Sequence, residues 1–338
     1  MNRFFLLTLS LFFPLSMMGQ LPFQKTDVKD VMKKVADWQI AHQKDVKHGA
    51  LDWTNAALYM GMLDWAELAE TEMGDASYYD WLVKLGRRYG WQPDKRMYHA
   101  DDIAVGQVFI DLYNKYKDKN MLYPTQARAE WVVNHPSDGP MDLDYKKRET
   151  LERWTWCDAL YMAPPVYVKL YMLTGDKRFI KFMNKEYKAT YDLLFDKDER
   201  LFYRDSRYLT QKEANGAKVF WGRGNGWVLG GLAEMLQDFP KNDKNRKFYE
   251  ELFVTLSARV AELQSADGFW HASMLDPASY PSPETSATGF IVYALAYGVN
   301  EGLLDKDTYL PIVEKGWKAL VSAVETDGKL GYVQPIGA

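Results

Sequence analysis

The sequence contains a single cysteine, Cys157, among its 338 residues. No disulfide can form within the chain, and the cysteine clusters of structural zinc sites are excluded. The five histidines are scattered along the chain, without the close spacing at which two histidines share one metal ion. The sequence therefore predicts no metal site and no cofactor, and we expect the fold to be stabilised by its hydrophobic core.

An excess of positive charge is also missing. Lysine and arginine number 42 against 46 acidic residues, and no basic block occurs. Because nucleic-acid binding needs a positively charged stripe, we expect no nucleic-acid partner.

Long apolar runs are limited to residues 4–15, which is short for a membrane span. Asn2 and Arg3 precede this run, and small residues follow it at 16–19. Such a pattern is typical of a secretory signal, predicted over residues 1–19. We expect an exported protein, periplasmic or secreted, that is not inserted in the membrane once the signal is removed. The alternative is an apolar amino-terminal strand of the fold.

Alternating strand patterns are scarce, and only residues 201–203 and 268–270 are candidates for small strands in loops. Apolar residues recur instead at helical spacing through the rest of the chain. Eleven helices are predicted, over residues 27–41, 51–73, 78–89, 102–116, 122–133, 154–173, 178–194, 228–236, 245–263, 285–297 and 308–324.

Short acidic turns separate these helices at regular intervals. Asp176, Asp243 and Asp305 lie 67 and then 62 residues apart, which is the length of one helical hairpin plus its loop. Repeats of this size predict an all-α (α/α)6 barrel formed by a single domain over residues 20–338, with an open helical solenoid as the alternative. The long loops should gather at one end and form a site. Twelve helices complete such a barrel. Either the count of eleven misses one helix, or the reading frame is shortened at residues 331–338, where a closing helix would be expected.

A glycine-rich string, FWGRGNGW, covers residues 220–227. It is predicted to be a loop that presents Trp221, Arg223 and Trp227 at the start of the following helix. Indole faces pack on sugar rings, and the guanidinium fork of arginine suits a carboxylate. The 12 tryptophans and 22 tyrosines of the chain fit a carbohydrate cleft. They fit a core rich in aromatic residues equally well, and the string itself is then a turn with two core tryptophans.

Carboxylates lie beside aromatic residues in two further segments. Asp158 is surrounded in sequence by aromatic and apolar residues, which raise the pKa of a carboxyl group and suit it to act as a general acid. The alternative is that Asp158 only caps the helix after it. Asp101 and Asp102 stand at a predicted helix start, where one of them can be the cap. His271 either donates to a substrate hydroxyl or is satisfied within its own loop.

Five motifs occur in order along nearly the whole mature chain: HADD at 99–102, WTWCDALYMAPP at 154–165, FWGRGNGW at 220–227, GFWH at 268–271 and ETSATGF at 284–290. In combination they resemble glycoside hydrolase family 105, the unsaturated rhamnogalacturonyl hydrolases, which are related to the unsaturated glucuronyl hydrolases. The resemblance implies an (α/α)6 barrel.

The resemblance also implies roles for individual residues. Asp158 matches the general acid/base, and Asp101 matches the second carboxylate of the site. The other candidates are substrate-binding residues: Trp53, Asn55, Asp102, Trp156, Trp221, Arg223, Trp227 and His271.

The implied reaction removes a terminal 4,5-unsaturated uronic acid from oligosaccharides that a pectin (rhamnogalacturonan) lyase has produced. A proton is added at C4 and water at C5. Residues 204–207 differ from members that carry a histidine in this loop, which leaves the neighbouring sugar open. The alternatives are an unsaturated glucuronyl hydrolase, a conventional (α/α)6 glycosidase acting on saturated oligosaccharides, or a sugar-binding barrel without activity. No oligomeric state is predicted.

Overall fold

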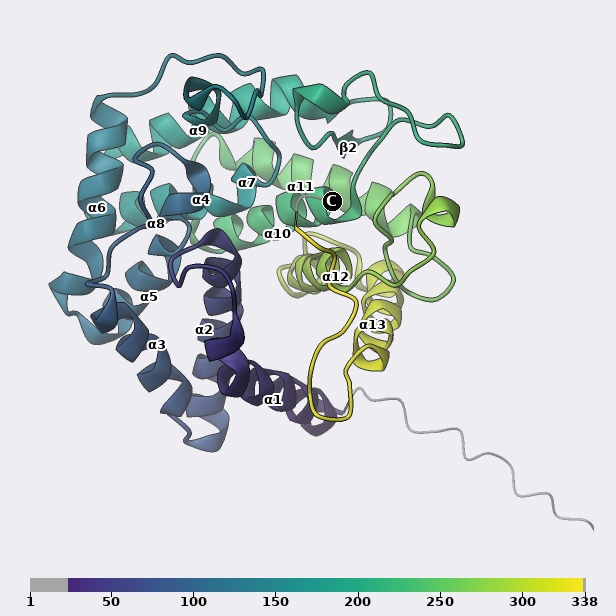
Figure 1. Ribbon diagram of the computed structural model, residues 1–338, viewed down its shortest axis with the longest axis horizontal. Helices are drawn as coiled ribbons and strands as arrows, with labels where there is room; N and C mark the ends of the chain where they lie inside the picture. The colour runs from purple at the N-terminus through teal and green to yellow at the C-terminus, as the bar shows by residue number, and fades with distance from the viewer. Residues whose placement is uncertain (1–23, 337–338) are drawn as a thin grey trace, which may run out of the picture.

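The computed structural model describes residues 24–336, so the predicted signal at 1–19 lies outside the described residues. Within this range the regular secondary structure is almost entirely α-helical (Figure 1). The helices are α1 Lys25–His42, α2 Trp53–Met73, α3 Ser77–Arg88, α4 Ala100–Ile103, α5 Gly106–Tyr116, α6 Lys119–Asn134, α7 Ala159–Met162, α8 Pro164–Thr174, α9 Lys177–Leu194, α10 Gly222–Asp238, α11 Arg246–Glu262, α12 Thr285–Asn300 and α13 Lys306–Ser322. The strands β1 Phe195–Asp196 and β2 Leu201–Phe202 form one small antiparallel ribbon.

The eleven long helices form two layers. The inner helices α2, α5, α8, α10 and α12 pack in that order, each against the next. The outer helices α3, α6, α9, α11 and α13 each pack against the inner helix that precedes them, and α1 packs against α2. Figure 1 shows the chain passing round the molecule in this order, from purple α1 to yellow α13. The predicted all-α architecture of stacked hairpins is confirmed.

The short acidic turns lie within the hairpins, between an inner helix and its outer partner. Gly74 and Gly175 end α2 and α8 in the left-handed conformation, with φ of 68° and 71°. This conformation costs glycine little because it has no Cβ atom. Aspartate carboxylates then accept the backbone N–H groups that open the outer helix, as Asp118, Asp176 and Asp305 do.

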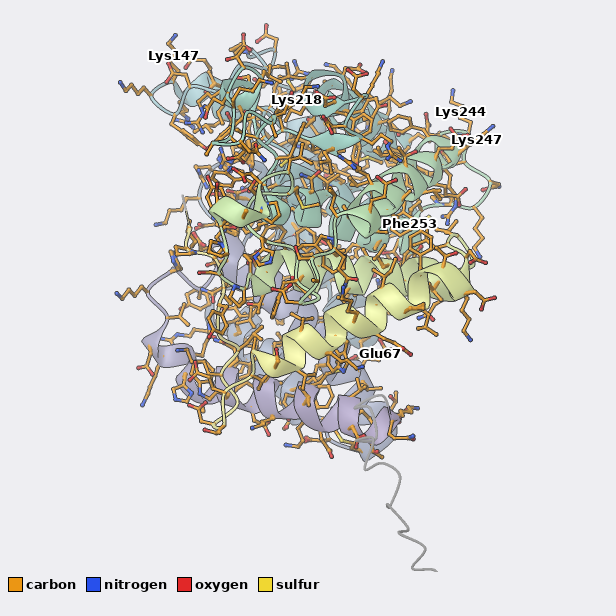
Figure 2. All side chains as sticks on the ribbon, turned by 90° about the vertical axis from the view of Figure 1, so that its right-hand side faces the viewer. Glu67, Lys147, Lys218, Lys244, Lys247 and Phe253 are labelled. Atoms are coloured by element: carbon orange, nitrogen blue, oxygen red, sulfur yellow. The ribbon has the colours of Figure 1, made fainter. Side chains whose placement is uncertain are left out.

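The long connections come at the opposite ends of the hairpins. Figure 2 shows Lys147, in one of these connections, and Lys244 and Lys247, at the short α10–α11 turn, on opposite sides of the molecule. The inner helices all begin at the end that carries the long connections. The sequence prediction that these loops gather at one end is therefore confirmed.

Two helix predictions are wrong at their amino-terminal ends. Residues 154–158 precede α7 in a non-helical segment, and Pro164 starts a separate helix, α8, after a break at Ala163. The glycine string is not a loop, because α10 begins at Gly222 and includes Trp227. Of the two candidate strands, residues 201–202 are confirmed, whereas 268–270 form an irregular loop.

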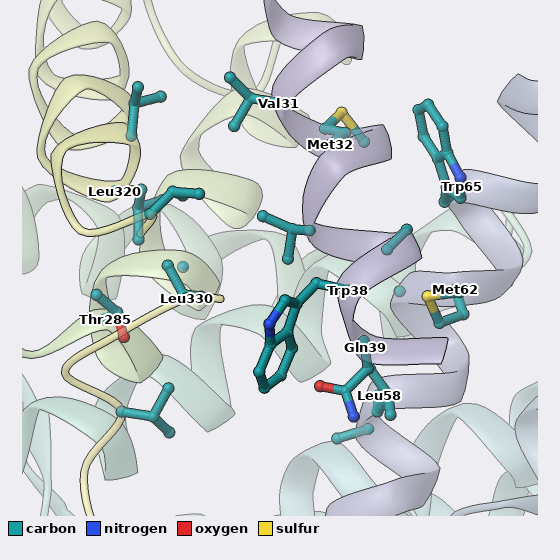
Figure 3. Close-up of a pocket in the computed structure, with 18 of the residues that line it drawn as sticks. Val31, Met32, Trp38, Gln39, Leu58, Met62, Trp65, Thr285, Leu320 and Leu330 are labelled. Atoms are coloured by element: carbon teal, nitrogen blue, oxygen red, sulfur yellow. The ribbon is translucent and has the colours of Figure 1, made fainter. Parts of the chain in front are cut away.

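The segment after α13 passes beside α1, the first helix of the described chain. Trp38 Nε1 donates to Asp327 Oδ2 at 3.0 Å, which joins α1 to the segment after α13. Between α2 and α12 lies an apolar groove of about 430 Å³, lined also by α1 and α13 (Figure 3). Trp38 and Leu58 project into it in that view. No helix in residues 24–336 is long and apolar enough to cross a membrane.

Candidate active site

Asp101 lies in the one-turn helix α4, at the loop-bearing end of the ring. Helix α4 is capped by His99, whose Nδ1 accepts the backbone N–H of Asp101 at 3.3 Å. Burial lowers the pKa of His99 to about 3, so the ring is neutral and Nδ1 is free to accept. The expected aspartate cap is thus replaced by a histidine cap, which leaves the carboxyl group of Asp101 available.

The Asp101 carboxyl group is buried and incompletely bonded. Its Oδ1 has no hydrogen-bond partner among the described residues. Burial, together with the nearby charge of Asp158, raises the pKa of Asp101 to about 8. Arg96 acts in the opposite direction but does not cancel these effects. Asp101 therefore holds a proton at neutral pH.

Asp158 stands directly before α7, which packs against α4. Its side chain makes no capping hydrogen bond, so the structure does not support the alternative of a simple helix cap. Oδ1 instead accepts the thiol hydrogen of Cys157 at 3.2 Å. The sequence predicted a raised pKa for Asp158, whereas in the structure burial raises the pKa of Asp101, its neighbour in the pair.

Asp102, next to Asp101 in sequence, is not part of the carboxyl pair. It is 2% exposed, and both carboxylate oxygens accept from Arg96: Oδ2 from the backbone N–H at 2.7 Å and Oδ1 from Nε at 2.9 Å. Its predicted role in substrate binding is therefore corrected to support of the loop that leads into α4.

Aromatic side chains cluster at the same end of the ring as the carboxyl pair. Trp53, at the start of α2, meets Trp227 edge to face at 5.8 Å. Trp227 is 3% exposed and packs on Tyr161 at 4.7 Å and Phe290 at 4.1 Å. Trp156 lies against the ring of His99 at 4.7 Å. The structure thus brings Trp53, Trp156 and Trp227 to the same end of the ring, with Trp53 the most accessible.

The first turns of α10 explain why the glycine string is helical. A Cβ atom on Gly222 would lie 2.3 Å from the carbonyl oxygen of His271, and one on Gly224 would lie 3.1 Å from Cys157 Sγ. These glycines allow α10 to approach its neighbours closely, and none of them needs a positive φ. Trp221 and Arg223 therefore project from a rigid helix start, with the guanidinium 5.8 Å from the indole centre.

Two further predicted residues support the site without facing it. Asn55 is 3% exposed; its Oδ1 accepts from Gln43 and its Nδ2 donates to the carbonyl of Gly49. His271 contacts the carbonyl oxygen of Ser282 through Nδ1 and lies 3.3 Å from Asp267 through Nε2. Because the protein itself bonds their polar atoms, the structure assigns Asn55 and His271 to supporting the loops. For His271 this agrees with the alternative that the histidine is satisfied within its own loop.

One residue near the pair was missed as a site residue. Arg204 interacts electrostatically with Asp158 and Asp101. The only sequence signal was its position in the loop at 204–207, which departs from the family pattern. Within residues 24–336, no group of three or more histidine, cysteine or acidic side chains is arranged to hold a metal ion.

A carboxyl pair near aromatic side chains, at one end of a ring of helical hairpins, is an arrangement that fits a glycoside hydrolase. The chain belongs to Glycosyl Hydrolase Family 88, which matches residues 31–338. Curated relatives named unsaturated 3S-rhamnoglycuronyl hydrolase come from Formosa agariphila and Alteromonas sp.. The first is 38% identical over 96% of this chain and 87% of its own, and the second 32% identical over 94% and 81%. The resemblance seen in the motifs is confirmed.

Solved structures agree in fold. One named as a polysaccharide lyase is 34% identical, with a TM-score of 0.83 over 93% of this chain and 88% of that chain. The unsaturated glucuronyl hydrolase of Bacillus sp. GL1 is 15% identical, with a TM-score of 0.68 over 90% and 87%. The latter likeness concerns the fold alone, which is the (α/α)6 six-hairpin toroid.

Proposed function

We propose that this glycosidase removes the terminal 4,5-unsaturated uronic acid from lyase-generated oligosaccharides in which rhamnose follows the uronide. The relatives at 38% and 32% identity carry names that combine an unsaturated glycuronyl group with rhamnose. A relative from Bacillus subtilis named unsaturated rhamnogalacturonyl hydrolase is 23% identical over 94% of this chain and 87% of its own. Rhamnose-linked unsaturated glycuronides are therefore the first substrates to test, and the expected rhamnogalacturonan products of pectin are the second.

The observation that carries this proposal is the carboxyl pair with one proton. Two carboxyl groups close together resist losing both protons, because the second negative charge is repelled by the first. Burial raises the pKa of Asp101 to about 8 beside Asp158, so near neutral pH the pair supplies both an acid and a base. Hydration of a vinyl ether needs both in succession.

The proposed reaction proceeds in two stages. The pair donates its proton to C4 of the unsaturated ring through Asp158, and positive charge develops at C5 and the ring oxygen. A water molecule adds at C5 and gives its proton back to the pair. The resulting hemiketal opens and releases the neighbouring sugar. No covalent bond to the enzyme forms, so the carboxylate separation that distinguishes retaining from inverting glycosidases does not apply.

Each part of the pair has its own role in this proposal. Asp158 contacts the substrate, and the Cys157 thiol fixes the orientation of its carboxylate. Asp101 stores the proton. Trp53 and Trp221, which are half-buried, provide the surfaces on which the flat unsaturated ring stacks, and Trp156 and Trp227 support the wall from behind.

The first experiment follows the ultraviolet absorbance of the C4=C5 bond during incubation with lyase digests of a rhamnose-containing glycuronan and of rhamnogalacturonan. A hydrolase of this type lowers the absorbance. Asp158→Asn should lose activity by about 10²–10⁴-fold, the contribution of a general acid or base.

Other outcomes point to other activities. Rising absorbance on intact polysaccharide would show a lyase, consistent with the name of one structural neighbour. Cleavage of saturated oligosaccharides at constant absorbance would show a conventional glycosidase. Sugar binding without turnover in a folded wild type would show a binding protein.

We also propose that the protein is exported, on the basis of the signal pattern at residues 1–19. Amino-terminal sequencing of the protein recovered from periplasm and culture medium tests this. A chain that starts after residue 19 in either fraction supports export, and an intact chain confined to the cytoplasm contradicts it.

A further inference from the structure

The loop after β2 is joined by its backbone to the segment that leads to Asp158. Trp156 and Asp205 form an antiparallel bridge, and the backbone N–H of Cys157 donates to the carbonyl of Arg204 at 2.8 Å. Arg204 is therefore held opposite the residue before Asp158. This arrangement fixes the position of Arg204 relative to the carboxyl pair more firmly than a mobile loop would.

The guanidinium of Arg204 is anchored on one side only. Nη1 donates to Asp205 Oδ2 at 2.6 Å and to the hydroxyl of Tyr145. Asp205 is fully buried and is itself held by Arg207, whose Nε donates to Oδ1 at 2.8 Å. Among residues 24–336, Nε and Nη2 of Arg204 have no protein partner, and its side chain is 20% exposed. Donors thus remain for a ligand.

Arg204 keeps its positive charge. Burial by itself lowers the pKa of Arg204, but the negative charge of Asp158 and the contacts with Tyr145 and Asp205 outweigh this, so its pKa is raised. A planar guanidinium with two unpaired nitrogens suits a carboxylate, which it can hold by two parallel hydrogen bonds.

The same loop also contacts Trp221, whose indole is predicted to bind the sugar. Tyr208 meets Trp221 edge to face at 5.4 Å. The loop therefore contacts the carboxyl pair through Arg204 and the indole through Tyr208. A sugar ring lying on Trp221 with one edge at Asp158 would have this loop along its side.

Arg223, the residue expected from sequence to hold the uronate, is less available. It is 8% exposed, and Nη1 donates to the carbonyl oxygens of Gln334 at 3.4 Å and Pro335 at 3.2 Å. Arg223 thus ties the start of α10 to the carboxyl-terminal segment.

We infer that Arg204, rather than Arg223, binds the carboxylate of the terminal unsaturated uronic ring. This inference rests on the proposed function and deepens it. The carboxylate is attached to C5, the neighbour of C4, so a carboxylate held at Arg204 places C4 beside Asp158. Arg204 also offsets the negative charge that an anionic substrate brings to a site already containing Asp158 and Asp205.

The test compares the free-acid substrate with its uronate methyl ester, in wild type and in Arg204→Gln, Arg204→Lys and Arg223→Gln. Hydration of the double bond is followed by absorbance, and KM and kcat are measured for each pair. In wild type we expect the acid to be preferred by about 10- to 100-fold in kcat/KM, the value of a charge-assisted hydrogen bond. The preference should fall to near unity in Arg204→Gln, mainly through KM.

Arg204→Lys keeps the charge and should retain part of the preference, which separates a binding role from a loss of folding. Arg207→Gln is the matched control: it removes the other arginine on Asp205 and should keep the acid-over-ester ratio. An unchanged ratio in folded Arg204→Gln, or collapse of the ratio in Arg223→Gln instead, overturns the inference alone. Failure of the wild type to hydrate either substrate overturns the proposed function and this inference with it.

Discussion

Carboxyl groups cluster in two regions of the ring, and the two clusters differ in whether a cation is paired with them. At the loop-bearing end, Asp101 and Asp158 face each other's charge, and Oδ1 of Asp101 has no partner among the described residues. Deeper along the inner helices, Asp111 and Asp238 flank Lys169, whose Nζ lies 3.0 and 2.7 Å from their carboxylates.

The comparison separates carboxyl groups that are paired with a cation, as expected of groups that stabilise the fold, from carboxyl groups without one, as expected of groups that take part in a reaction. Lys169 keeps its proton because the charges of Asp111 and Asp238 outweigh the effect of burial and raise its pKa. Lys169 in turn lowers the pKa of Asp111, but burial has the larger effect and the pKa of Asp111 is raised. A buried charge without such a partner destabilises the fold, and this cost is common where a group is kept reactive.

The inner cluster is not fully neutralised. Burial, together with the charges of neighbouring acids, raises the pKa of Glu234 to about 8 and that of Asp64 to about 6. Lys169 is the cation that faces this cluster, and it lowers both pKa values. We therefore expect the stability of the ring to depend strongly on this one lysine.

Lys169→Met should produce the largest change in stability. It leaves Asp111 and Asp238, whose side chains are 29% and 38% exposed, without their cation. Because water screens these two carboxylates in part, we expect a cost of about 2–3 kcal/mol in the free energy of unfolding, less than for a fully buried pair. Denaturant unfolding of both proteins measures this. Lys247→Met, in an exposed pair with Glu251, is the control and should change stability little. If Lys169→Met lowered the turnover of folded enzyme at unchanged stability, the cluster would belong to the catalytic machinery instead.

Asp101→Asn should lower activity and raise stability at high pH. The folded pKa of about 8 lies above the unfolded value of about 3.9, so the folded state binds the extra proton. The wild type therefore loses stability as pH rises from about 4 to about 8, and the asparagine variant escapes this part of the loss. Activity should fall by about 10²-fold or more. Melting temperatures measured across this pH range check the sign, and parallel curves for the two proteins would contradict the raised pKa.

Gly231→Ala should have a smaller effect on stability and a selective effect on the site. The added Cβ would lie 2.5 Å from the carbonyl oxygen of Leu160 and 2.7 Å from the Cα atom of Tyr161. Because these are backbone atoms next to Asp158, we expect a shift of α7, a loss of about 1–3 kcal/mol and reduced kcat. Gly61→Ala on α2 is the contrast: no atom lies within 4 Å of its Cβ, so it should be neutral or stabilising. Equal effects of the two variants would refute the argument from close helix approach.

Much of the fold could be predicted from local patterns. Helical spacing of apolar residues and acidic caps gave eleven helices, and the structure has eleven long helices in residues 24–336. The carboxyl pair could be recognised as well, because Asp101 and Asp158 stand in segments whose residue types suit a site. These features depend on neighbours within a few positions, which a single sequence displays directly.

Local patterns failed where distant segments decide the conformation. The glycine string was predicted to be a loop because glycine allows a positive φ, yet α10 begins there and its glycines let it pack closely against His271 and Cys157. Asn55, Asp102 and His271 looked available for a sugar until the structure showed their polar atoms bonded to the protein.

The sequence by itself therefore determined the helical class and the hairpin repeat, since periodicity sets these, and its motifs predicted Asp101 and Asp158 as the catalytic carboxyl groups. Only the tertiary structure decided which carboxyl group holds the proton and which arginine faces the pair. Both depend on electrostatic and backbone contacts between segments about 50 residues apart, as between Asp101 and Asp158 or Cys157 and Arg204.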